Sequence, residues 1–350
     1  MRRQAVTIED VALKSAVSKA TASLALNGRP GLKPETVARV LEAARELGFS
    51  PNESARRMGS AGSGGARTMM IGFLCDHQIG PAGPDPFHFN ILLGVQRAAQ
   101  AASYHVVVGM NQSKPAEQLD YVRGLSNGGV DGWVLADSAS KEVVEFLGER
   151  QIPKVIAGDS TLFPGVTSIH GDSIGGAGMA TRHLIDIGHR RIGFAGWERS
   201  HAWSSMRLAG YLSALGGAGI VPNDDAILFA NDLSELEPWL RGFIDNDATP
   251  TAIVAATDWI AVESLKVAAR LGIRVPEQLS VIGFDDVPWL AHLVAPALSS
   301  VHVSIDLIGE TAFRYLLDEI KDVGSPGMRM ALPVHLVLRD STAPPSTIGD

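Results

Sequence analysis

Residues 7–28 read TIEDVALKSAVSKATASLALNG, and this stretch decides the fold of the N-terminal part of the chain. Thr7 and Asp10 have the spacing of a capping box, which predicts that a helix begins there. Ser18 offers an N-cap to a second helix after a turn of about three residues. Pro34, at a first helical turn, opens a third helix. Two short helices at this spacing predict a helix-turn-helix unit, although many three-helix units bind no DNA.

The charge of the chain is unevenly distributed. The sequence holds 30 Lys/Arg and 38 Asp/Glu residues, of which the first 60 positions contain ten basic and six acidic ones. That balance of +4 leaves −12 for the remainder, within a net charge of −8. A small basic module joined to a large acidic body indicates that the two parts meet different partners.

The composition is that of a globular protein. With 45% hydrophobic residues over 350 positions, the chain can bury a sizeable core in two or three units, which excludes disordered and fibrous classes. Its single cysteine, Cys75, excludes an internal disulfide and a cysteine-based zinc site. The start of the chain has no apolar signal segment, and no stretch approaches the roughly 18 apolar residues of a membrane helix. We therefore expect a cytoplasmic protein with no membrane partner.

Ordered motifs between residues 6 and 58 carry a family resemblance. They read TIEDVA at 7–12, VSKAT at 17–21, ALNG at 25–28, PET at 34–36, AARELGF at 43–49 and PN at 51–52. In this order they resemble the LacI/GalR family of bacterial transcription regulators. The resemblance implies a repressor-type regulator that binds double-stranded operator DNA and associates with the nucleoid when bound.

The resemblance also implies which residues contact DNA. Residues 18–26 form the expected recognition helix in the major groove, where Lys19 and Ala20 read bases. The expected contacts in this domain are Thr7, Ser18, Lys19, Ala20, Thr21, Ser23, Leu24 and Asn27, with Ser18, Thr21, Ser23 and Asn27 at positions that the family uses for phosphates.

Two residues depart from the family pattern. Ala16 stands where the family has a turn glycine, and only glycine adopts a left-handed backbone freely, so this turn is either strained or differently shaped. Leu24 stands where a base-reading arginine is common, and leucine cannot donate to guanine. Leu24 is therefore either a base-facing residue that leaves readout to Lys19, Ala20 and DNA shape, or an ordinary core residue.

Residues 51–58 resemble the hinge helix of the family, which folds on operator DNA and pairs with its dimer mate. Asn52, Ala55 and Met58 are the expected contacts, with Met58 at the position of a leucine that wedges into the minor groove. The alternative is a helix-to-linker transition without a role in binding. The following run of Gly and Ser at 59–66 predicts a flexible linker and a domain boundary.

From Met69 onward, short apolar runs alternate with helical patterns. Seven runs predict buried strands, namely 69–75, 104–109, 132–136, 154–157, 191–195, 252–255 and 280–283. Periodic segments such as 89–102 predict helices. This alternation predicts an α/β fold with parallel sheets and enough chain for two lobes.

Landmarks in this body also follow the LacI/GalR pattern, including DPFH at 85–88, GHRRI at 188–192 and VIGFDD at 281–286. The body of that family is similar to periplasmic sugar-binding proteins, with two Rossmann-like lobes joined by three crossing strands. The expected domains are a helix-turn-helix domain (1–50), a hinge helix with linker (51–68), a two-lobed effector-binding and dimerisation domain (69–345) and a tail (346–350). Its first lobe is expected at about 69–165 and 297–327, and its second at about 166–296 and 328–345.

An effector, expected to be a sugar or sugar derivative, should bind between the lobes. Arg207 can fork across adjacent hydroxyls and Asp258 can accept from two of them, and both positions match regular ligand contacts of the family. Trp203 supplies either a stacking face for the sugar or lobe packing. The remaining candidates are Asp159, at a strand end, and Phe87 with His88, as a wall of the first lobe.

Other function classes carry weaker signals. A hydrolase would use the block at 171–173, but this Gly-Asp-Ser sequence lies mid-chain, and Asp172 is better explained as a helix cap. A solute-binding protein would share the body but would not carry residues 1–58. The histidines lack metal-ligand spacing, so we expect no enzyme activity, no metal and no cofactor. The polar tail after Ser341 contains no leucine heptad, so we expect a homodimer.

Overall fold

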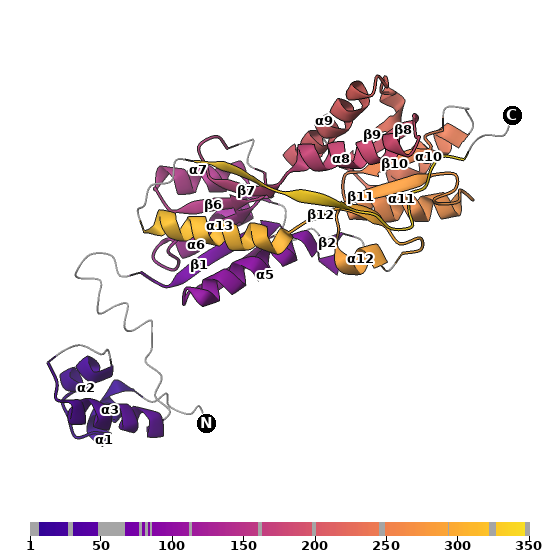
Figure 1. The fold of residues 1–350 in the computed structure, drawn as a ribbon. Coiled ribbons are helices and arrows are strands. Elements are labelled where there is room, and N and C mark those ends of the chain that lie inside the picture. Colours follow the sequence, from indigo (N-terminus) through magenta and orange to yellow (C-terminus); the bar gives the residue numbers. More distant parts are fainter. Residues whose placement is uncertain are drawn as a thin grey trace. The chain divides into compact units, whose positions relative to one another are not determined.

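The computed structural model describes most of the 350-residue chain (Figure 1). The described residues are 7–26, 31–47, 67–76, 79–80, 83–84, 86–111, 114–159, 163–197, 201–244, 249–292, 294–321 and 327–346. Contacts divide the chain into two compact units, Met1–Thr68 and Met69–Asp350.

The described residues of the first unit form three helices, α1 (Ile8–Lys14), α2 (Lys19–Leu26) and α3 (Pro34–Leu47). The capping box is confirmed, because the Thr7 hydroxyl accepts from the Asp10 amide while the Asp10 carboxylate accepts from the Thr7 amide at 2.7 Å. The helices enclose a small core of Val11, Ala12, Ala22, Ala25, Val40, Ala43 and Ala44. Small side chains on α2 let the three helices approach closely, which produces the predicted helix-turn-helix unit.

The turn between α1 and α2 keeps the left-handed conformation that glycine favours. Ala16 has φ of +53°, so the turn retains its shape and the alanine side chain bears the strain. Of the two readings of this turn, the strained one is confirmed.

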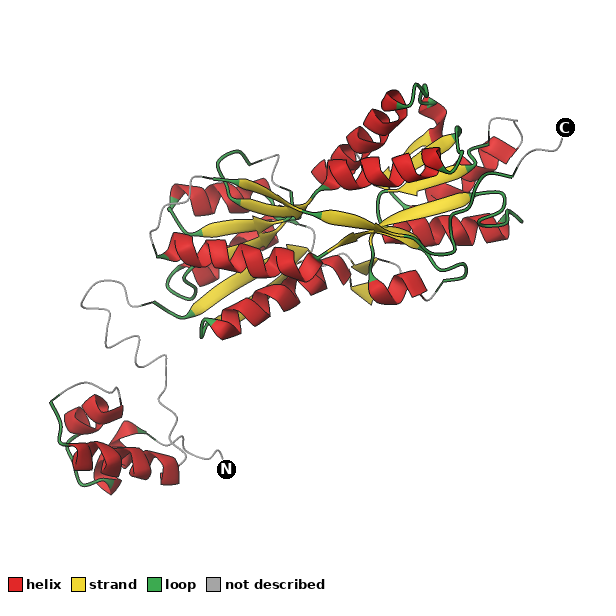
Figure 2. Ribbon diagram, in the orientation of Figure 1, coloured by secondary structure: helices red, strands yellow, loops and turns green. Residues whose placement is uncertain are grey.

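The second unit contains two six-stranded sheets, each flanked by helices (Figure 2). The first sheet has the order β13 (Arg329–Leu332), β7 (Ser168–Gly171), β6 (Lys154–Ala157), β5 (Trp133–Ala136), β1 (Met70–Asp76) and β4 (His105–Asn111), with all pairs parallel. The second has the order β14 (Val334–Val337), β12 (Ser299–Val303), β11 (Ser280–Asp285), β10 (Ala252–Ala255), β8 (Ile192–Trp197) and β9 (Ile227–Ala230), in which only the β12–β14 pair is antiparallel. A short hairpin joins β2 (Ile79–Gly80) to β3 (Gly83–Pro84).

The helices of each lobe cover both faces of its sheet. The first lobe has α5 (Pro86–Ala101), α6 (Pro115–Ser126), α7 (Lys141–Glu149) and α13 (Ile305–Ile320), and the second has α8 (Ser173–Asp186), α9 (Ala202–Gly217), α10 (Leu236–Ile244), α11 (Asp258–Arg270) and α12 (Pro288–His292), with 3-10 turns at Asp224–Ala226 and Leu233–Glu235. Neighbouring residues of one strand, such as Phe73 and Leu74, belong to different apolar clusters, because successive side chains point to opposite faces. The α/β fold with parallel sheets is confirmed.

The chain crosses between the sheets three times, and these crossings lie side by side. A Cβ on Gly171, at the end of β7, would lie 2.9 Å from a methyl carbon of Val303 and 3.5 Å from one of Val334. Val303 ends β12 and Val334 begins β14. Glycine is required at this point because the crossing strands approach too closely for a side chain.

The expected lobe limits need correction at these crossings. Strands β7 and β13 fall inside the expected ranges of the second lobe, 166–296 and 328–345, but pair in the first sheet. Strand β12 falls inside the expected 297–327 portion of the first lobe but pairs in the second sheet. A crossing strand belongs to the sheet whose hydrogen bonds it completes, and that partner is not visible in the strand's own sequence.

Among the described residues, none of the helices is both long and apolar enough to traverse a lipid bilayer. The same part of the chain has no cluster of three or more His, Cys, Asp or Glu side chains placed to hold a metal ion.

Candidate functional site

Helix α2 presents a polar face to solvent. Ser18, Lys19 and Ala20 are exposed, and Thr21 and Ser23 are half-buried. Ala22 and Ala25 turn inward to the core of the unit. This division leaves the candidate DNA contacts free of the packing that holds the helix in place.

Leu24 lies on the same outward surface. Its side chain is 37% exposed and is not part of the apolar core of the first unit. The alternative that Leu24 is an ordinary core residue is therefore wrong for this structure.

The start of α2 is held by local hydrogen bonds. The Ser18 hydroxyl accepts from the Thr21 amide at 3.1 Å and lies 2.9 Å from the Thr21 hydroxyl, as expected of an N-cap. Lys19 forms an ion pair with Glu9 of α1. The candidates Asn27, Asn52, Ala55 and Met58 lie outside the described residues.

In the second unit, charged side chains gather where the strands of both sheets end. We call His88, Asp137, Trp203, Arg207, Asp258 and Asp285 the interlobe cluster. Asp137 follows β5 of the first sheet, Asp258 comes shortly after β10, and Asp285 ends β11. The carboxyl ends of parallel strands are the usual ligand-binding edge of such sheets.

Arg207 is the centre of this cluster. Its guanidinium donates to the backbone oxygen of Ala256 and, at 3.1 Å, to the Asp285 carboxylate. The guanidinium carbon lies 3.6 Å from the ring centre of Phe284 and 5.0 Å from that of Trp203. Its Nε is buried without a hydrogen-bond partner among the described residues. Burial lowers the pKa of Arg207, and the negative charges of Asp285, Asp137 and Asp258 oppose that shift.

Asp258, which the sequence offered as a ligand contact, makes its hydrogen bonds within the body of the protein. One carboxylate oxygen accepts from the Ser300 hydroxyl at 2.6 Å and the other from the Val287 amide at 2.8 Å, and the residue is 1% exposed. Burial raises the pKa of this carboxyl well above its usual value, and the charge of Asp285 adds to the effect. Asp258 therefore braces the turn after β11, and a ligand hydroxyl finds no exposed carboxylate oxygen there.

That turn carries backbone strain. Asp285 and Asp286 have φ of +106° and +51°, a region that non-glycine residues rarely adopt. The Asp286 carboxylate lies 2.7 Å from Arg339 and 3.0 Å from His302 on β12. Asp258 accepts from the Val287 amide just after this turn, and Asp286 pairs with His302 and Arg339. These contacts hold the turn in place and keep the Asp285 carboxylate against Arg207.

The first lobe contributes a second set of paired groups. A ring nitrogen of His88 lies 3.0 Å from the Asp137 carboxylate, and the Phe87 ring meets the His88 ring edge-on at 5.7 Å. Asp159 is buried and accepts from Arg329 at 2.8 Å. Trp203 stacks on His201, with 5.4 Å between ring centres, and packs against the core, so its packing role is observed and its stacking on a sugar stays a prediction.

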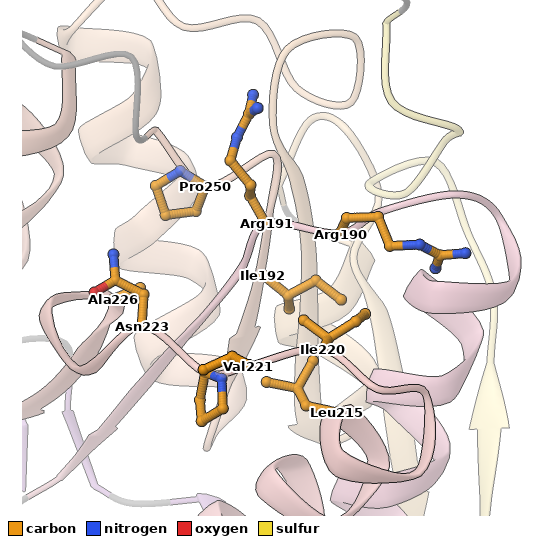
Figure 3. Close-up of a pocket in the computed structure, with 10 residues that line it drawn as sticks. Arg190, Arg191, Ile192, Leu215, Ile220, Val221, Asn223, Ala226 and Pro250 are labelled. Atoms are coloured by element: carbon orange, nitrogen blue, oxygen red, sulfur yellow. The ribbon is translucent and has the colours of Figure 1, made fainter.

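A separate pocket lies at the amino end of β8, at the other end of the strand from the interlobe cluster (Figure 3). Ile192, Leu215, Ile220 and Val221 supply most of its apolar lining. Arg190, Arg191 and Asn223 also line it, and the Arg191 guanidinium donates to the backbone oxygen of Thr249 at 3.0 Å. This pocket has few convergent polar groups, so the interlobe cluster is the better candidate for a ligand rich in hydroxyls.

The hydrolase alternative does not fit the structure. The Asp172 carboxylate accepts from the Gly175 amide at 2.8 Å as the N-cap of α8. Ser173 is the first residue of that helix and is 5% exposed. A capping aspartate and a buried serine cannot act on a substrate.

Comparisons with known proteins identify the family of the chain. Residues 7–52 match the family described as bacterial regulatory proteins, lacI family, and residues 181–342 match the periplasmic binding protein-like domain. The HTH-type transcriptional regulator CelR of Thermobifida fusca is 30% identical over 346 residues, which cover 97% of this chain and 99% of CelR. The chain belongs to the LacI family of bacterial transcription regulators. It is a DNA-binding regulator of transcription and not an enzyme.

Further LacI-family members match over nearly their whole length. The repressor CytR of Escherichia coli K12 is 30% identical over 342 residues, which cover 97% of this chain and 96% of CytR. A solved CelR–cellobiose complex is 28% identical with a TM-score of 0.72, covering 96% of this chain and 99% of that one. A lac repressor dimer bound to operator and the anti-inducer ONPF has a TM-score of 0.84 at 23% identity, covering 97% and 100%, and this likeness shows the shared fold.

Within this LacI-family body, sequence reasoning missed two carboxylates of the cluster. Asp285 was visible as part of the VIGFDD landmark, and Asp137 directly follows the apolar run at 132–136. Both positions are strand ends, which is the signal that could have found them. Their pairing with Arg207 and His88 required the tertiary structure.

Proposed function

We propose that this LacI-family regulator is a repressor whose operator affinity is controlled by an uncharged carbohydrate bound at the interlobe cluster. The observation that carries the proposal is Arg207, whose guanidinium lies against Phe284 and Trp203 and beside Asp285. A guanidinium fork, an acceptor and aromatic faces together match a sugar ring, which has adjacent hydroxyls and an apolar CH face. The cellobiose in the solved CelR complex supports a carbohydrate class.

The charges around the cluster favour a neutral ligand. Arg207 is paired with Asp285, Arg329 with Asp159, and Arg339 with Asp286, so each of these cations already faces a carboxylate. Asp137 adds a further acid near Arg207. A phosphate or carboxylate ligand would have to displace these partners and would meet repulsion from the acids, whereas hydroxyls can both donate and accept.

We divide the residues at the interlobe cluster between those that contact the ligand and one that positions them. We assign direct contact to Arg207 and Asp285, with Phe87, His88, Asp159 and Trp203 as neighbouring wall residues. Asp258 positions Asp285 by holding the strained turn. The Asp286 contacts with His302 and Arg339 join this turn to the crossing strands, so ligand binding can bias the angle between the lobes.

On the DNA side, we assign α2 to the major groove of each operator half-site. Lys19 and Ala20 read bases, and Ser18, Thr21, Ser23 and Asn27 contact phosphates. Thr7, the N-cap of α1, is assigned as a further DNA contact. Asn52, Ala55 and Met58 are assigned to the minor groove at the centre of the operator. Leu24, exposed on the same surface, is left to contact a thymine methyl or the sugar edge.

The proposed regulator is a cytoplasmic homodimer. Exposed apolar side chains on α5 and α13, namely Phe89, Leu93 and Leu307, supply a face for a second copy in the first lobe. Trp289, 46% exposed and edge-on to Trp259, supplies one in the second lobe. Two-fold symmetric surfaces of this kind match a two-fold symmetric operator.

The test is a ligand screen on the full-length protein by thermal shift, followed by calorimetry. Cellobiose, glucose and ribose are compared with glucose 6-phosphate and ribose 5-phosphate. A ligand at 100 times its Kd adds roughly 2.7 kcal/mol of stability. We expect at least one neutral sugar to bind, to bind less tightly to Arg207→Ala, and to lower affinity for a selected DNA site. Tighter binding of the phosphates, or no response to any carbohydrate, would falsify the proposal.

A further inference from the structure

An ion pair joins the start of the recognition helix to the first helix. Lys19 is the first residue of α2, and its ammonium donates to a carboxylate oxygen of Glu9 on α1. The two side chains are 64% and 59% exposed. This bond lowers the pKa of Glu9, so the acid is ionised at neutral pH. Neither residue is part of the core of the first unit.

The pair differs from its neighbours in position. Lys14 pairs with Glu46 at 2.7 Å between α1 and α3, and Arg45 pairs with Glu42 at 3.0 Å within α3. Among the described residues of this unit, Glu9–Lys19 is the ion pair that includes a residue of α2. The N-terminal residues of a recognition helix are those that approach base edges. Glu9 therefore stands beside the place where the bases are read.

The chemistry of this pair matches one base pair. In the major groove, guanine presents two acceptors, N7 and O6, and the paired cytosine presents the donor N4 amine. The Lys19 ammonium is a donor that can face the guanine acceptors, and the Glu9 carboxylate beside it is an acceptor that can face the cytosine amine. Resting on the proposed placement of α2 in the major groove, we propose that Lys19 and Glu9 together read one G·C pair in each half-site. Lys19 donates to guanine, and Glu9 accepts from cytosine N4.

Glu9 supplies discrimination that Lys19 lacks by itself. A lysine can donate to guanine, but also to a phosphate or to N7 of adenine. Thymine at the cytosine position offers the acceptor O4 and a methyl group to the carboxylate, so the acid repels the wrong base. A merely neutralising role for Glu9 predicts something different, because loss of the acid would then raise affinity for all sequences alike.

The test is selection of binding sites from a random DNA library with the full-length protein. Wild type is compared with Glu9→Ala, Lys19→Ala and the double variant. The matched control is Glu46→Ala, which removes the α3 acid that pairs with Lys14 of α1, another exposed ion pair, and so makes the same change in net charge. Thermal melting checks that each variant is folded. Selected sites are then measured individually at fixed salt, because salt shifts all affinities.

We expect wild type to select a symmetric site with one G·C pair per half-site that both single variants relax. Replacement of that pair by A·T should weaken wild type about tenfold, equivalent to about 1.4 kcal/mol, and should weaken Glu9→Ala by less than about threefold. The double variant should relax no further position, since both residues act on one base pair. Glu46→Ala should keep the wild-type preferences.

Three outcomes overturn the inference. One is a wild-type site with no such G·C position, and another is a Glu9→Ala protein with higher affinity but unchanged preferences. The third is relaxation of different base pairs by the two single variants. In all three cases a symmetric site that is still selected leaves the DNA-binding proposal intact, whereas enrichment of no sequence at all contradicts both.

Discussion

Two ion pairs, Glu9–Lys19 of the first unit and Arg207–Asp285 of the second, lie in opposite environments. In the first unit, Glu9 and Lys19 are both more than half exposed, whereas Arg207 and Asp285 of the second unit are 7% and 9% exposed. An exposed ion pair contributes at most about 1 kcal/mol to stability, so its two side chains can separate and contact DNA at little cost. Breaking a buried pair leaves an uncompensated charge, which costs several times more. The Glu9–Lys19 pair can therefore exchange its partners more easily than the Arg207–Asp285 pair.

The largest effect should come from separating the two units. Removal of residues 1–68 should abolish DNA binding and leave carbohydrate binding intact, because the contacts divide at Thr68 and Met69. In the intact protein, DNA affinity should fall roughly a thousandfold between 50 and 200 mM salt, as expected for several phosphate contacts. Fluorescence anisotropy measures both. A flat salt response, or DNA binding by the truncated chain, contradicts the division of labour.

Breaking the buried pair should destabilise the body strongly. Arg207→Ala leaves Asp285 and Asp258 in a buried site without their cation, which should lower the free energy of unfolding by about 3–5 kcal/mol. The control Arg241→Ala removes one of the two arginine partners of Glu237, in a more exposed pair, and should cost under about 1 kcal/mol. Urea unfolding followed by tryptophan fluorescence measures both. Equal losses for the two variants would contradict the comparison.

Asp258, the buried acid near the Arg207–Asp285 pair, should make the stability of the second unit depend on pH. The pKa of Asp258 is raised in the folded protein above its ordinary value of 3.8. The folded state therefore holds this proton more tightly than the unfolded state, so the contribution of Asp258 to stability falls as the pH rises from about 4 through the raised pKa. Asp258→Asn removes the titration. The difference in unfolding free energy between wild type and Asp258→Asn should thus change with pH in that window, and a constant difference would refute it.

The smallest effect should come from the strained turn of the first unit. Ala16→Gly relieves a left-handed alanine and should stabilise that unit by about 1 kcal/mol. The control Ala38→Gly, on an exposed position of α3, should destabilise it by a similar amount. Thermal melting of the two variants should therefore move in opposite directions. Movement in the same direction would show that the turn is not under strain.

Local patterns in the sequence predicted much of the fold. The capping box at Thr7, the cap at Ser18 and the proline at Pro34 placed the three helices of the first unit. Apolar runs placed seven strands of the second unit to within two residues at each end. These features are local, because a cap or an apolar run depends on residues a few positions apart.

Other strands carried no such signal. Strands β7, β12, β13 and β14 are short and lie at or beside the crossings, where each strand takes its partners from distant parts of the chain. Helix α13 packs on the first lobe although β12, just before it, pairs in the second sheet. Partner choice of this kind depends on long-range pairing, which the sequence of a short segment does not encode by itself.

The same limit applied to the candidate site. Arg207, which guanidinium chemistry and the resemblance both indicated, lies at the centre of the cluster, and its role in effector binding stays a prediction. Sequence and resemblance assigned Asp258 to the ligand, but its two oxygens are used by Ser300 and Val287, which are distant in sequence. The sequence by itself determined the helix-turn-helix unit, the α/β body and the charge that each part carries. Only the tertiary structure decided which carboxylate faces Arg207, because that choice depends on how strands from different parts of the chain end side by side.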